Sequence, residues 1–352
     1  MKIIFEIANN HMGDVAHGER LLKILGEISK QYPYDFCVKF QFRDLATLIH
    51  DDHKGSSLKY IKRFEETDLT EEAWASLFDT AKASGFGTMV TPFDEPSVSK
   101  LIRYGADELK IASCSLGDWP LFEEIAAKWN GPITMSTGGA ALSDIDNAVS
   151  FWCNRKFDLS LMHCVALYPT PSDNLDLGQI KFLRERYPSL TIGYSTHEDP
   201  SDFLAGPIAV ALGAEVLEKH VGLSTGDYAV NNYSAEPNQV RLWLDALADA
   251  RSRIGESARR RHIAPEEASS ITSLARGAYA AKSLTANQTI STNDVYFAMP
   301  ATETALTAKD FSKYSQITLT EDLGADSPVS SQVVLQQMTH ARVRQCHDKI
   351  AE

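Results

Sequence analysis

Alternating strand-like and helix-like segments over about 250 residues predict a (β/α)8 barrel followed by a small β domain. Short apolar runs recur along the chain, and segments with helical spacing of apolar residues separate them. Beyond residue 275 the pattern gives way to turn-rich segments that resemble each other. An open, doubly wound sheet is the alternative, but the G-x-G-x-x-G turn of nucleotide-binding sheets does not follow the first strand.

The elements follow in order along the chain. Apolar runs predict eight strands at residues 2–8, 35–41, 87–92, 107–112, 133–137, 159–164, 191–197 and 214–220. The intervening helices are expected at residues 18–28, 69–81, 95–104, 119–129, 145–154, 177–186, 203–213 and 239–254. The helical spacing of Leu21, Leu25 and Ile28 supports the first helix. Thr70 is a fair N-cap for the second, and Gly213 is a stop signal for the seventh.

Two of these strands end in a histidine. The segments 191–197 and 214–220 close with His197 and His220, and the helix between them implies parallel neighbouring strands. Side chains alternate along a strand, so Ser195 shares a face with His197, and Glu218 shares a face with His220. Neighbouring strands lie roughly 5 Å apart, so histidines at matching strand ends can hold one metal ion. Two unrelated histidines, one in the core and one on the surface, are the alternative.

The change in pattern also sets the expected domain boundaries. We expect a barrel over residues 1–256, a charged linker over 257–275, and a β domain over 276–352 that ends in a tail. Residues 284–295 resemble residues 323–334, and two copies of a strand-turn-strand unit predict internal pseudo-symmetry. A domain of this size supports little chemistry alone, so we expect it to serve as a lid or an oligomer contact.

Composition narrows the class of protein. Hydrophobic residues make up 43% of the chain and charged residues 23%, as in ordinary soluble proteins. A net charge of −13 argues against general binding to nucleic acids or anionic membranes. No apolar stretch reaches membrane-spanning length, and no signal-peptide pattern follows Met1. The odd number of widely spaced cysteines indicates reduced thiols and a cytoplasmic protein: Cys37, Cys114, Cys153, Cys164 and Cys346.

Polar residues gather at the predicted carboxyl ends of the strands, where a barrel places its chemistry. They are Glu6, Asn10, Lys39, Gln41, Asp94, Glu95, Lys110, Ser113, Ser136, Thr137, Gly138, Gly139, His163, Tyr168, Ser195, His197, Glu218 and His220. Lys39 and Lys110 are the most informative, because each interrupts an apolar strand and a buried lysine is costly without an anion. With Ser113 and Ser136, they predict a cradle for a phosphate or a carboxylate.

The lysines allow other interpretations. Each could extend to solvent, or pair with Glu6 or Glu218 for structural reasons. A Schiff-base lysine is a further alternative, since barrels host aldolases of that kind. The histidine pair instead favours a metal that polarises a carbonyl group. Imidazole and oxygen ligands together suit Mn²⁺, Fe²⁺, Co²⁺ or Zn²⁺ better than Ca²⁺.

Taken in order, these stretches resemble the sialic acid synthase family, the phosphoenolpyruvate-dependent nonulosonate synthases. The matching motifs are EIANNHMG (6–13), VKFQ (38–41), TPFD (91–94), LKIAS (109–113), MSTGG (135–139), MHC (162–164), YPTP (168–171), GYSTH (193–197) and EKH (218–220). So many ordered motifs over the whole barrel make the resemblance specific. The C-terminal repeat resembles, less strongly, the antifreeze-like β-clip domain that follows the barrel in this family.

The resemblance implies a reaction and a role for each matching residue. Phosphoenolpyruvate would condense with the aldehyde of an open-chain hexose derivative, typically an N-acylated mannosamine, to give a nine-carbon 2-keto-3-deoxy acid and phosphate. By resemblance, Glu6, Lys39, Lys110, His197 and His220 are catalytic; Lys39, Lys110, Ser113, Ser136 and Ser195 bind phosphoenolpyruvate; Asn10, Gln41 and Tyr168 bind the sugar; and His197 and His220 bind the metal. Mn²⁺ is the implied metal, with Mg²⁺ or Co²⁺ as alternatives. The resemblance also implies a homodimer in which the small domain of one subunit caps the barrel of the other.

Departures from the family concern mainly the sugar. Ala166 replaces an Asn or Ser, Thr196 replaces the aspartate of a Ser-Asp-His stretch, and Met299 lies where the small domain's arginine is expected. The loop 226–234 lacks the family's Gly-Pro-Asp, so Asn231, Asn232 or Asp227 would have to substitute as sugar-binding residues. Without a bidentate arginine, we do not expect ordinary N-acetylmannosamine to be the substrate. The phosphoenolpyruvate half is retained, and the sugar half is altered.

Three functions therefore compete. The first is a metal-dependent transferase, a nonulosonate synthase that acts on a modified amino or deoxy hexose. The second is a phosphoenolpyruvate-condensing enzyme for a shorter or unsubstituted aldose, suggested by the missing arginine and by Ala166. The third is a non-catalytic binding protein that retains the barrel. Intact Lys39, Lys110 and the histidine pair weigh against this third function, because such a buried cluster is costly to keep without a use.

Overall fold

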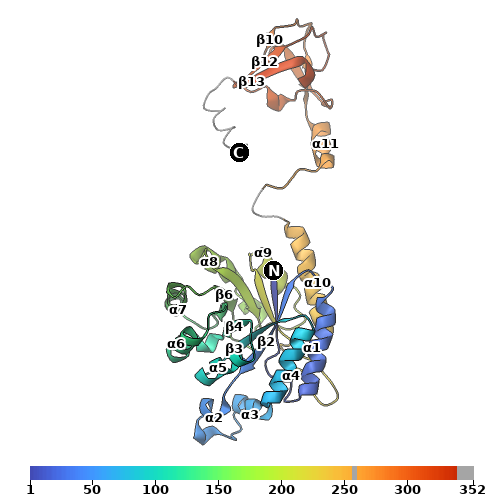
Figure 1. Cartoon of the computed structure of the whole chain (residues 1–352). Coiled ribbons are helices and arrows are strands. Elements are labelled where there is room, and N and C mark those ends of the chain that lie inside the picture. Colours follow the sequence, from blue (N-terminus) through green and yellow to red (C-terminus); the bar gives the residue numbers. More distant parts are fainter. Residues whose placement is uncertain (256–259, 339–352) are drawn as a thin grey trace. The chain divides into compact units, whose positions relative to one another are not determined.

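The computed structural model describes residues 1–255 and 260–338 (Figure 1). The chain divides into two compact units, Met1–Gly255 and Glu256–Glu352. Cys346, the expected C-terminal tail and the start of the expected linker at residues 257–259 lie outside the described residues.

Eight parallel strands close into a barrel in the first unit. Their bounds are β1 (Lys2–Glu6), β2 (Asp35–Phe42), β3 (Gly87–Pro92), β4 (Glu108–Ile111), β5 (Ile133–Ser136), β6 (Leu159–Cys164), β7 (Thr191–Thr196) and β8 (Val216–His220). Each strand pairs with the next in chain order, and β1 pairs with β8, which confirms the predicted barrel. The register places Glu6 opposite Lys39 on one side and opposite His220 on the other.

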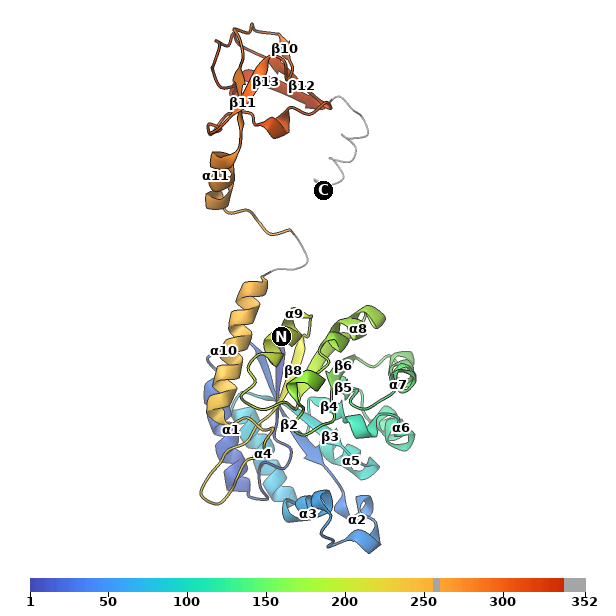
Figure 2. The ribbon, with the colours of Figure 1, turned by 180° about the vertical axis from the view of Figure 1, so that it is seen from behind.

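Helices surround the barrel (Figure 2). They are α1 (Val15–Ser29), α4 (Glu71–Ala83), α5 (Glu95–Arg103), α6 (Trp119–Lys128), α7 (Leu142–Asn154), α8 (Gly178–Arg186), α9 (Ala205–Ala211) and α10 (Pro237–Ile254). The predicted cap of α4 is present, because the Thr70 side chain accepts the N–H of Ala73. Within the described ranges, no helix combines the length and apolarity needed to cross a bilayer.

Two short helices interrupt the connection between β2 and β3. They are α2 (Leu45–Leu48) and α3 (Lys59–Glu66), and they fall in a polar stretch for which the sequence predicts no helix. Neither helix buries a residue. Tyr60, Ile61 and Phe64 in α3 have helical spacing, but in the sequence-based prediction the stretch counts as polar. Helix α9 is shorter than expected at its start, because Asp202 Oδ1 accepts the N–H groups of Leu204 and Ala205 and holds the preceding chain in a turn.

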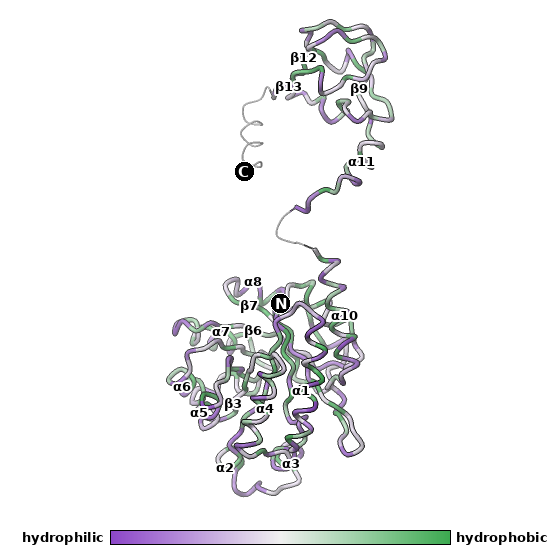
Figure 3. The backbone as a smooth tube through the Cα atoms, turned by 45° about the vertical axis from the view of Figure 1, so that its right-hand side comes forward, coloured by the Kyte–Doolittle hydropathy of each residue, from purple (hydrophilic) through white to green (hydrophobic). Residues whose placement is uncertain are grey.

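Apolar side chains close the amino-terminal part of the barrel interior. This cluster consists of Ile4, Cys37, Met89, Met162 and Val216, and all five are buried. A larger apolar layer lies between the strands and the helices. Figure 3 shows green segments running through the strands and purple segments in the surrounding helices and loops. The buried polar cluster of the barrel interior lies beyond this apolar cluster, towards the carboxyl ends of the strands, while an ion pair between Lys2 and Glu108 lies at the amino-terminal end.

Within its described part, the second unit consists of one α-helix, two short 3-10 helices and two antiparallel sheets. Helix α11 (Pro265–Leu274) lies in the segment expected to be a linker. One sheet has the order β10 (Thr289–Ile290), β12 (Ser315–Leu319), β13 (Val334–Met338), and the other pairs β9 (Gly277–Ala280) with β11 (Val295–Ala298). Antiparallel sheets after the barrel agree with the predicted small β domain.

The two copies of the sequence repeat are related by matching contacts. Leu284 N donates to Leu323 O at 2.8 Å, and Leu323 N donates to Leu284 O at 2.9 Å. Asn287 and Asp326 occupy equivalent turn positions in the two copies, and their φ angles are 65° and 63°. The structure therefore has the internal pseudo-symmetry that the repeat predicts.

Candidate functional site

Two buried ammonium groups share one carboxylate inside the barrel. Lys39 Nζ lies 2.6 Å from Glu218 Oε1 and 2.6 Å from Glu6 Oε2, and Lys110 Nζ lies 2.7 Å from Glu218 Oε2. Lys110 Nζ also contacts Met162 Sδ at 3.1 Å. The two lysines therefore lie close together, as the sequence predicts. Their partners are Glu6 and Glu218, the carboxylates that the alternative interpretation, pairing for structural reasons, had named.

The pKa values of this cluster follow from its charges. Burial alone would lower the pKa of Lys39, but the charges of Glu218 and Glu6 outweigh it and raise that pKa. The pKa of Lys110 is lowered, chiefly by burial, because it has only the one shared carboxylate and Lys39 lies nearby. Burial opposes ionisation of Glu218, yet Lys110 and Lys39 hold the pKa of that carboxyl below its ordinary value. Lys110 is thus the ammonium group that gives up its proton more easily.

The predicted serines lie around the cluster at different strand ends. Ser195 Oγ donates to Glu218 Oε1 at 3.1 Å, so it belongs to the lysine cluster. Ser113 Oγ accepts the N–H of Gly138 at 2.9 Å and lies 3.5 Å from Cys164 Sγ. A Cβ at position 138 would lie 2.9 Å from Ser113 Oγ, so a side chain there would displace the hydroxyl. Ser136 is buried at the end of β5.

The two histidines lie side by side, and tyrosines pack against both. The ring centres of His197 and His220 are 5.3 Å apart. The Tyr168 ring lies 4.3 Å from His197, the Tyr233 ring lies 5.1 Å from His220, and the two tyrosine rings are 5.2 Å apart. His197 Nδ1 lies 2.8 Å from Val165 O, which holds a proton on Nδ1 and leaves the lone pair on Nε2.

The histidine pair fits a divalent cation. Burial, reinforced by His220, lowers the pKa of His197 to about 4, and burial lowers the pKa of His220 to about 3, so both rings are neutral at neutral pH. His220 Nδ1 is buried without a hydrogen-bond partner. Two imidazoles on one metal ion, with nitrogen–metal distances of about 2.1 Å, have ring centres roughly 5 Å apart, as here. The described residues form no metal-holding cluster of three or more His, Cys, Asp or Glu, so water or substrate would complete the coordination.

The sugar-binding candidates are only partly brought together. Gln41 Nε2 donates to Glu6 Oε2 at 3.4 Å, which places Gln41 beside the lysine cluster. Asn10 is buried, and its amide donates to Val221 O at 2.7 Å and to Ser234 Oγ at 2.9 Å. Asn231 Nδ2 donates to Asn10 Oδ1 at 3.4 Å. Asn232 is exposed and makes none of these hydrogen bonds. Asn10 therefore joins two loops of the mouth, and Asn232 does not reach them.

One residue predicted at the mouth points elsewhere. His163 lies on β6 between the inward-facing Met162 and Cys164, so its ring faces the outside of the barrel. There it stacks on Tyr194, with ring centres 5.9 Å apart, and its Nε2 lies 2.8 Å from Leu175 O. The sequence-based prediction placed His163 at the site because it lies near the end of a strand. Side chains alternate along a strand, however, and this alternation puts His163 on the outer face of the barrel.

Sequence reasoning also missed residues that contact the site. Tyr233 packs on His220 from a loop that carries no periodic pattern. Arg43 Nη2 donates to Gln41 Oε1 at 2.6 Å. The alternation Lys39, Gln41, Arg43 along one strand face was the signal that could have found it.

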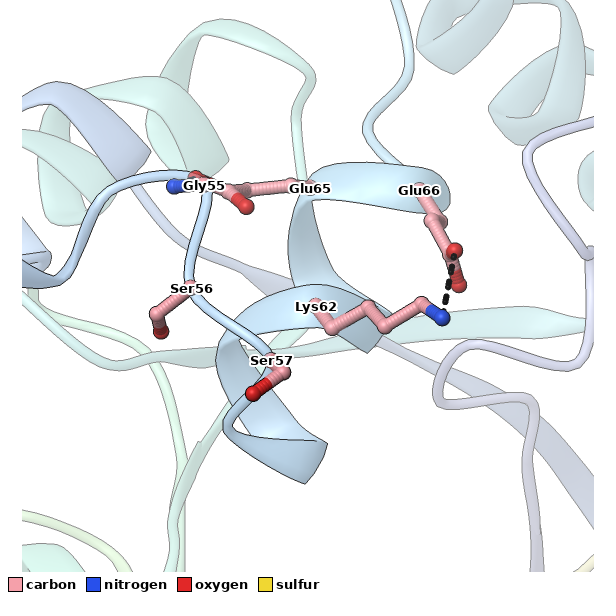
Figure 4. A pocket seen from close by; sticks show the side chains of 6 residues that line it. All are labelled: Gly55, Ser56, Ser57, Lys62, Glu65 and Glu66. Carbon is pink, nitrogen blue, oxygen red and sulfur yellow. Dashed lines mark hydrogen bonds and ion pairs between the residues drawn. The ribbon is translucent and has the colours of Figure 1, made fainter.

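A surface hollow elsewhere on the first unit does not contain the candidate residues. It is lined by Gly55, Ser56, Ser57, Lys62, Glu65 and Glu66, from α3 and the loop before it (Figure 4). Lys62 Nζ pairs with Glu66 Oε1 at 3.7 Å, and Gly55 N donates to Glu65. No barrel strand contributes a side chain to it, so we place the candidate site at the barrel mouth.

The comparison with protein families agrees with this arrangement. The model described as the NeuB family matches residues 34–259, which include the second to eighth strands and both histidines. The chain belongs to the NeuB family. Relatives with established names are sugar-acid synthases of the sialic, legionaminic and pseudaminic types. The chain is similar to the N-acetylneuraminate-9-phosphate synthase of Drosophila melanogaster, which is 30% identical over 259 residues, 70% of this chain and 67% of that protein.

Two further relatives of the NeuB chain cover more of its length. The pseudaminic acid synthase of Campylobacter jejuni is 28% identical and is matched over 85% of this chain and 87% of its own. A crystal structure from Chromobacterium violaceum, provisionally assigned as spore coat polysaccharide biosynthesis protein E, is 46% identical with a TM-score of 0.92. It covers 95% of this chain and 99% of its own. The similarity thus extends over both units.

Proposed function

We propose that the protein condenses phosphoenolpyruvate with an open-chain modified amino or deoxy hexose. The products are a nine-carbon 2-keto-3-deoxy acid and inorganic phosphate. The observation that carries this proposal is the pair of buried ammonium groups of Lys39 and Lys110 on one carboxylate, at the end of the barrel that also holds two neutral histidines. Membership of the NeuB family supports it, because named relatives are synthases of such acids.

The anionic substrate would bind beside the lysines. Phosphoenolpyruvate carries a carboxylate and a phosphate, and the lumen offers the ammonium groups of Lys39 and Lys110 with the Ser195 hydroxyl next to them. Charge-assisted hydrogen bonds of this kind are about twice as strong as neutral ones. The substrate anions would replace Glu218 as the partner of at least one lysine.

The reaction assigns a task to several side chains. C3 of phosphoenolpyruvate bonds to the aldehyde carbon, and the aldehyde oxygen takes up a proton. Water then adds to C2 and loses one proton, phosphate leaves with the electron pair of the C2–O bond, and the C2 hydroxyl loses its remaining proton as the 2-keto group forms. Glu6, which is buried opposite His220 in the β-sheet register, would accept the proton of that water. Lys110, with its lowered pKa, is suited to protonate the departing phosphate.

The histidines would hold the divalent cation, for which Mn²⁺ is our first choice and Mg²⁺ or Co²⁺ are alternatives. When bound, such an ion supplies Lewis-acid polarisation of the aldehyde oxygen. Val165 O orients the His197 ring for this role through Nδ1. Tyr168 and Tyr233 pack against the rings and limit the access of water to them.

The test is the release of phosphate from phosphoenolpyruvate. We expect release only when Mn²⁺ and a suitable aldose are both present, and a panel of amino, deoxy and unsubstituted aldoses identifies the acceptor. Mass spectrometry of the product counts its carbons, so a nine-carbon acid supports the proposal and a shorter acid supports a shorter-chain synthase. No release with any aldose would favour a binding protein instead.

A pair of histidine variants tests the metal assignment. We expect His220→Ala to lose Mn²⁺ binding, measured by electron paramagnetic resonance. Its activity should fall by more than roughly 100-fold, the loss that follows when only a residue supporting a metal ligand is removed. His163→Ala is the matched control, since His163 is also buried near the carboxyl end of a barrel strand, β6, but faces outward. Unchanged turnover of His220→Ala, with the fold intact, would refute the assignment.

We also propose a homodimer in which the small domain of one subunit caps the barrel of its partner, on the basis of the family resemblance. Light scattering would then give twice the mass of the chain. A mixture of His220→Ala with a variant altered only in residues 276–338 would regain activity if the active site contains residues from both subunits.

A further inference from the structure

The two histidines of the site are oriented by different means. His197 Nδ1 lies 2.8 Å from Val165 O, and this contact fixes the orientation of its ring. His220 Nδ1 is buried and has no hydrogen-bond partner in the described part of the chain. A metal-binding imidazole almost always donates its other ring nitrogen to a group that orients it. The orientation of the His220 ring therefore depends on the groups that pack against it.

Four rings at the barrel mouth form a closed ring of contacts. The Tyr233 ring lies 5.1 Å from His220 and 5.2 Å from Tyr168, and the Tyr168 ring lies 4.3 Å from His197. The two imidazoles, 5.3 Å apart, complete it. The Tyr233 and His220 planes are nearly perpendicular, at 88°, which is a favoured arrangement of two aromatic rings. Tyr233 thus covers one side of the imidazole that lacks an orienting hydrogen bond.

Tyr233 belongs to a loop that folds back tightly on itself. This β8–α10 loop comprises residues 221–236, and near its two ends Gly222 N donates to Ala235 O at 3.0 Å. A Cβ at position 222 would lie 3.0 Å from both methyl carbons of Val230 and 3.3 Å from the amide nitrogen of Asn10. A side chain there would push the loop away from Asn10.

One buried amide connects both ends of the β8–α10 loop. Asn10 Nδ2 donates to Val221 O at 2.7 Å and to Ser234 Oγ at 2.9 Å. Asn10 Oδ1 accepts from Asn231 Nδ2 at 3.4 Å, and Asn231 Oδ1 accepts the backbone N–H of Tyr233 at 3.1 Å. Hydrogen bonds therefore lead without a break from Asn10 to the backbone of Tyr233.

The turn that carries Asn10 is itself held in place. Asn10 N donates to Ile7 O at 2.8 Å, directly after β1. The preceding residue, Asn9, donates from Nδ2 to Thr67 Oγ1 at 2.6 Å, and its carbonyl oxygen accepts from Arg63 Nη2 at 2.8 Å. Because both neighbouring contacts come from α3 and the residue that ends it, Asn10 has a fixed position from which to hold the loop.

The Asn10 amide has no N–H group left for a substrate. An asparagine side chain carries two N–H groups, and both are used within the protein. The side chain is also buried, with 2% of the residue exposed. A sugar hydroxyl that replaced either bond would leave a buried carbonyl or hydroxyl unpaired, which is costly. These contacts favour a role other than the sugar contact that the family resemblance implies for Asn10.

We propose that Asn10 is a positioning residue that acts on His220 through Tyr233. By holding the β8–α10 loop, it places the Tyr233 ring against the imidazole and sets the orientation of that imidazole. This inference rests on the proposed function, in which His220 binds the metal ion.

The experiment combines two measurements on the full-length protein. Electron paramagnetic resonance gives the Mn²⁺ affinity, and ¹⁵N NMR of the metal-free protein gives the ring signals of His220, assigned by their loss in His220→Ala. We expect Asn10→Ala and Tyr233→Ala each to weaken Mn²⁺ binding by about 10–100-fold, the range for residues that support a metal ligand, and to shift the His220 signals. The double variant should bind Mn²⁺ about as weakly as the weaker single variant, because both changes interrupt one connection.

Two further variants separate this role from general damage to the loop. Tyr233→Phe keeps the ring and should bind Mn²⁺ as the wild type does. Ser224→Ala is the matched control, since it removes a hydrogen bond of the same loop, from Ser224 Oγ to Glu236 Oε1 at 2.7 Å. It should change neither the Mn²⁺ affinity nor the His220 signals.

Several results would overturn the inference. One is wild-type Mn²⁺ affinity in folded Asn10→Ala, and another is a loss of aldose binding in that variant with unchanged Mn²⁺ affinity, which would make Asn10 a sugar ligand. If Asn10→Ala does not fold, equal Mn²⁺ affinities of Tyr233→Ala and Tyr233→Phe would overturn it. If the wild type binds no Mn²⁺, the metal assignment of the proposed function fails. The His220 signals then decide the inference, which is overturned if Tyr233→Ala leaves them unchanged.

Discussion

Lys219 Nζ lies 2.7 Å from Glu198 Oε1, and both side chains are fully buried on the outer face of the barrel wall. Lys219 lies between Glu218 and His220, and Glu198 directly follows His197. The ion pair thus joins the residues adjacent to the two histidines across the β7–β8 edge. Tyr194 OH donates to the other oxygen of Glu198 at 3.1 Å. Thr196 lies opposite Lys219 in the register, but its buried hydroxyl makes no hydrogen bond to the described residues. The charge of Lys219 is therefore compensated by Glu198 and not by its neighbour on β7.

We therefore predict that Lys219→Met destabilises the barrel by about 3–5 kcal/mol, because it leaves the Glu198 charge buried without a partner. Urea unfolding followed by tryptophan fluorescence measures the loss. The double variant Lys219→Met with Glu198→Leu removes both charges and should recover most of the stability. In the double variant we also expect weaker Mn²⁺ binding, since the ion pair between the residues adjacent to His197 and His220 no longer helps to hold their spacing. Full stability of the single variant would contradict this account of the pair.

A second prediction concerns the carboxylate shared by the lysines. Glu218→Gln keeps the size of the side chain but removes the negative charge that Lys39 and Lys110 share. The site gains one net positive charge, so we expect phosphoenolpyruvate to bind more tightly, by roughly tenfold for one charged contact. Turnover should fall by about 10²-fold, because the lysines lose the group that orients them. Calorimetry and steady-state kinetics separate the two effects. Weaker phosphoenolpyruvate binding would show that Glu218 does not compete with the substrate.

The sequence predicted the inward-facing residues better than their contacts. Side-chain alternation is a consequence of backbone geometry, so the positions of Lys39, Glu218 and His220 along their strands are enough to place all three on the inner face. The same rule could have excluded His163 and included Arg43. It could not choose between pairing and exposure for Lys39 and Lys110, because both outcomes are compatible with an inward-facing lysine.

Contacts made by loops were beyond the sequence argument. Glu198 lies just after β7, where alternation ends, so its partner depends on how the following loop turns. Phe64 and Phe93, which both pack against Arg43, come from segments after different strands. Helix α3, which carries Phe64, buries no residue, and its short run of Tyr60, Ile61 and Phe64 at helical spacing does not say which group the Phe64 ring contacts.

A third prediction concerns pH. Burial lowers the pKa of His11 and of His197 to about 4 and that of His220 to about 3, whereas the ordinary value is 6.5. As pH falls below 6.5, the unfolded chain takes up protons that the folded chain does not, so the free energy of unfolding decreases between pH 6.5 and about 4. For each of His11 and His197, the loss can reach roughly 3 kcal/mol.

The variant His11→Gln isolates one of these contributions. Its unfolding free energy should depend less steeply on pH than that of the wild type between pH 6.5 and 4, when both are measured in urea. The exposed His53 provides the control, and His53→Gln should leave the slope unchanged. Equal slopes for the wild type and His11→Gln would mean that His11 titrates normally.

The last prediction concerns the repeated turns of the second unit. Asn287 and Asp326 have positive φ angles of 65° and 63°, which a residue with a branched side chain adopts only at a cost. We expect Asn287→Val to destabilise the second unit by roughly 1–2 kcal/mol and Asn287→Gly to be nearly neutral. Since Tyr296 OH donates to Asp326 Oδ1 at 3.0 Å, Asp326→Gly should cost more than Asn287→Gly. All five tryptophans lie before residue 255, so tryptophan fluorescence does not report on unfolding of the second unit. Hydrogen exchange of the amides of residues 277–338 measures it instead. A difference between Val and Gly at position 287 that spreads to the barrel amides would show that the two units do not unfold independently.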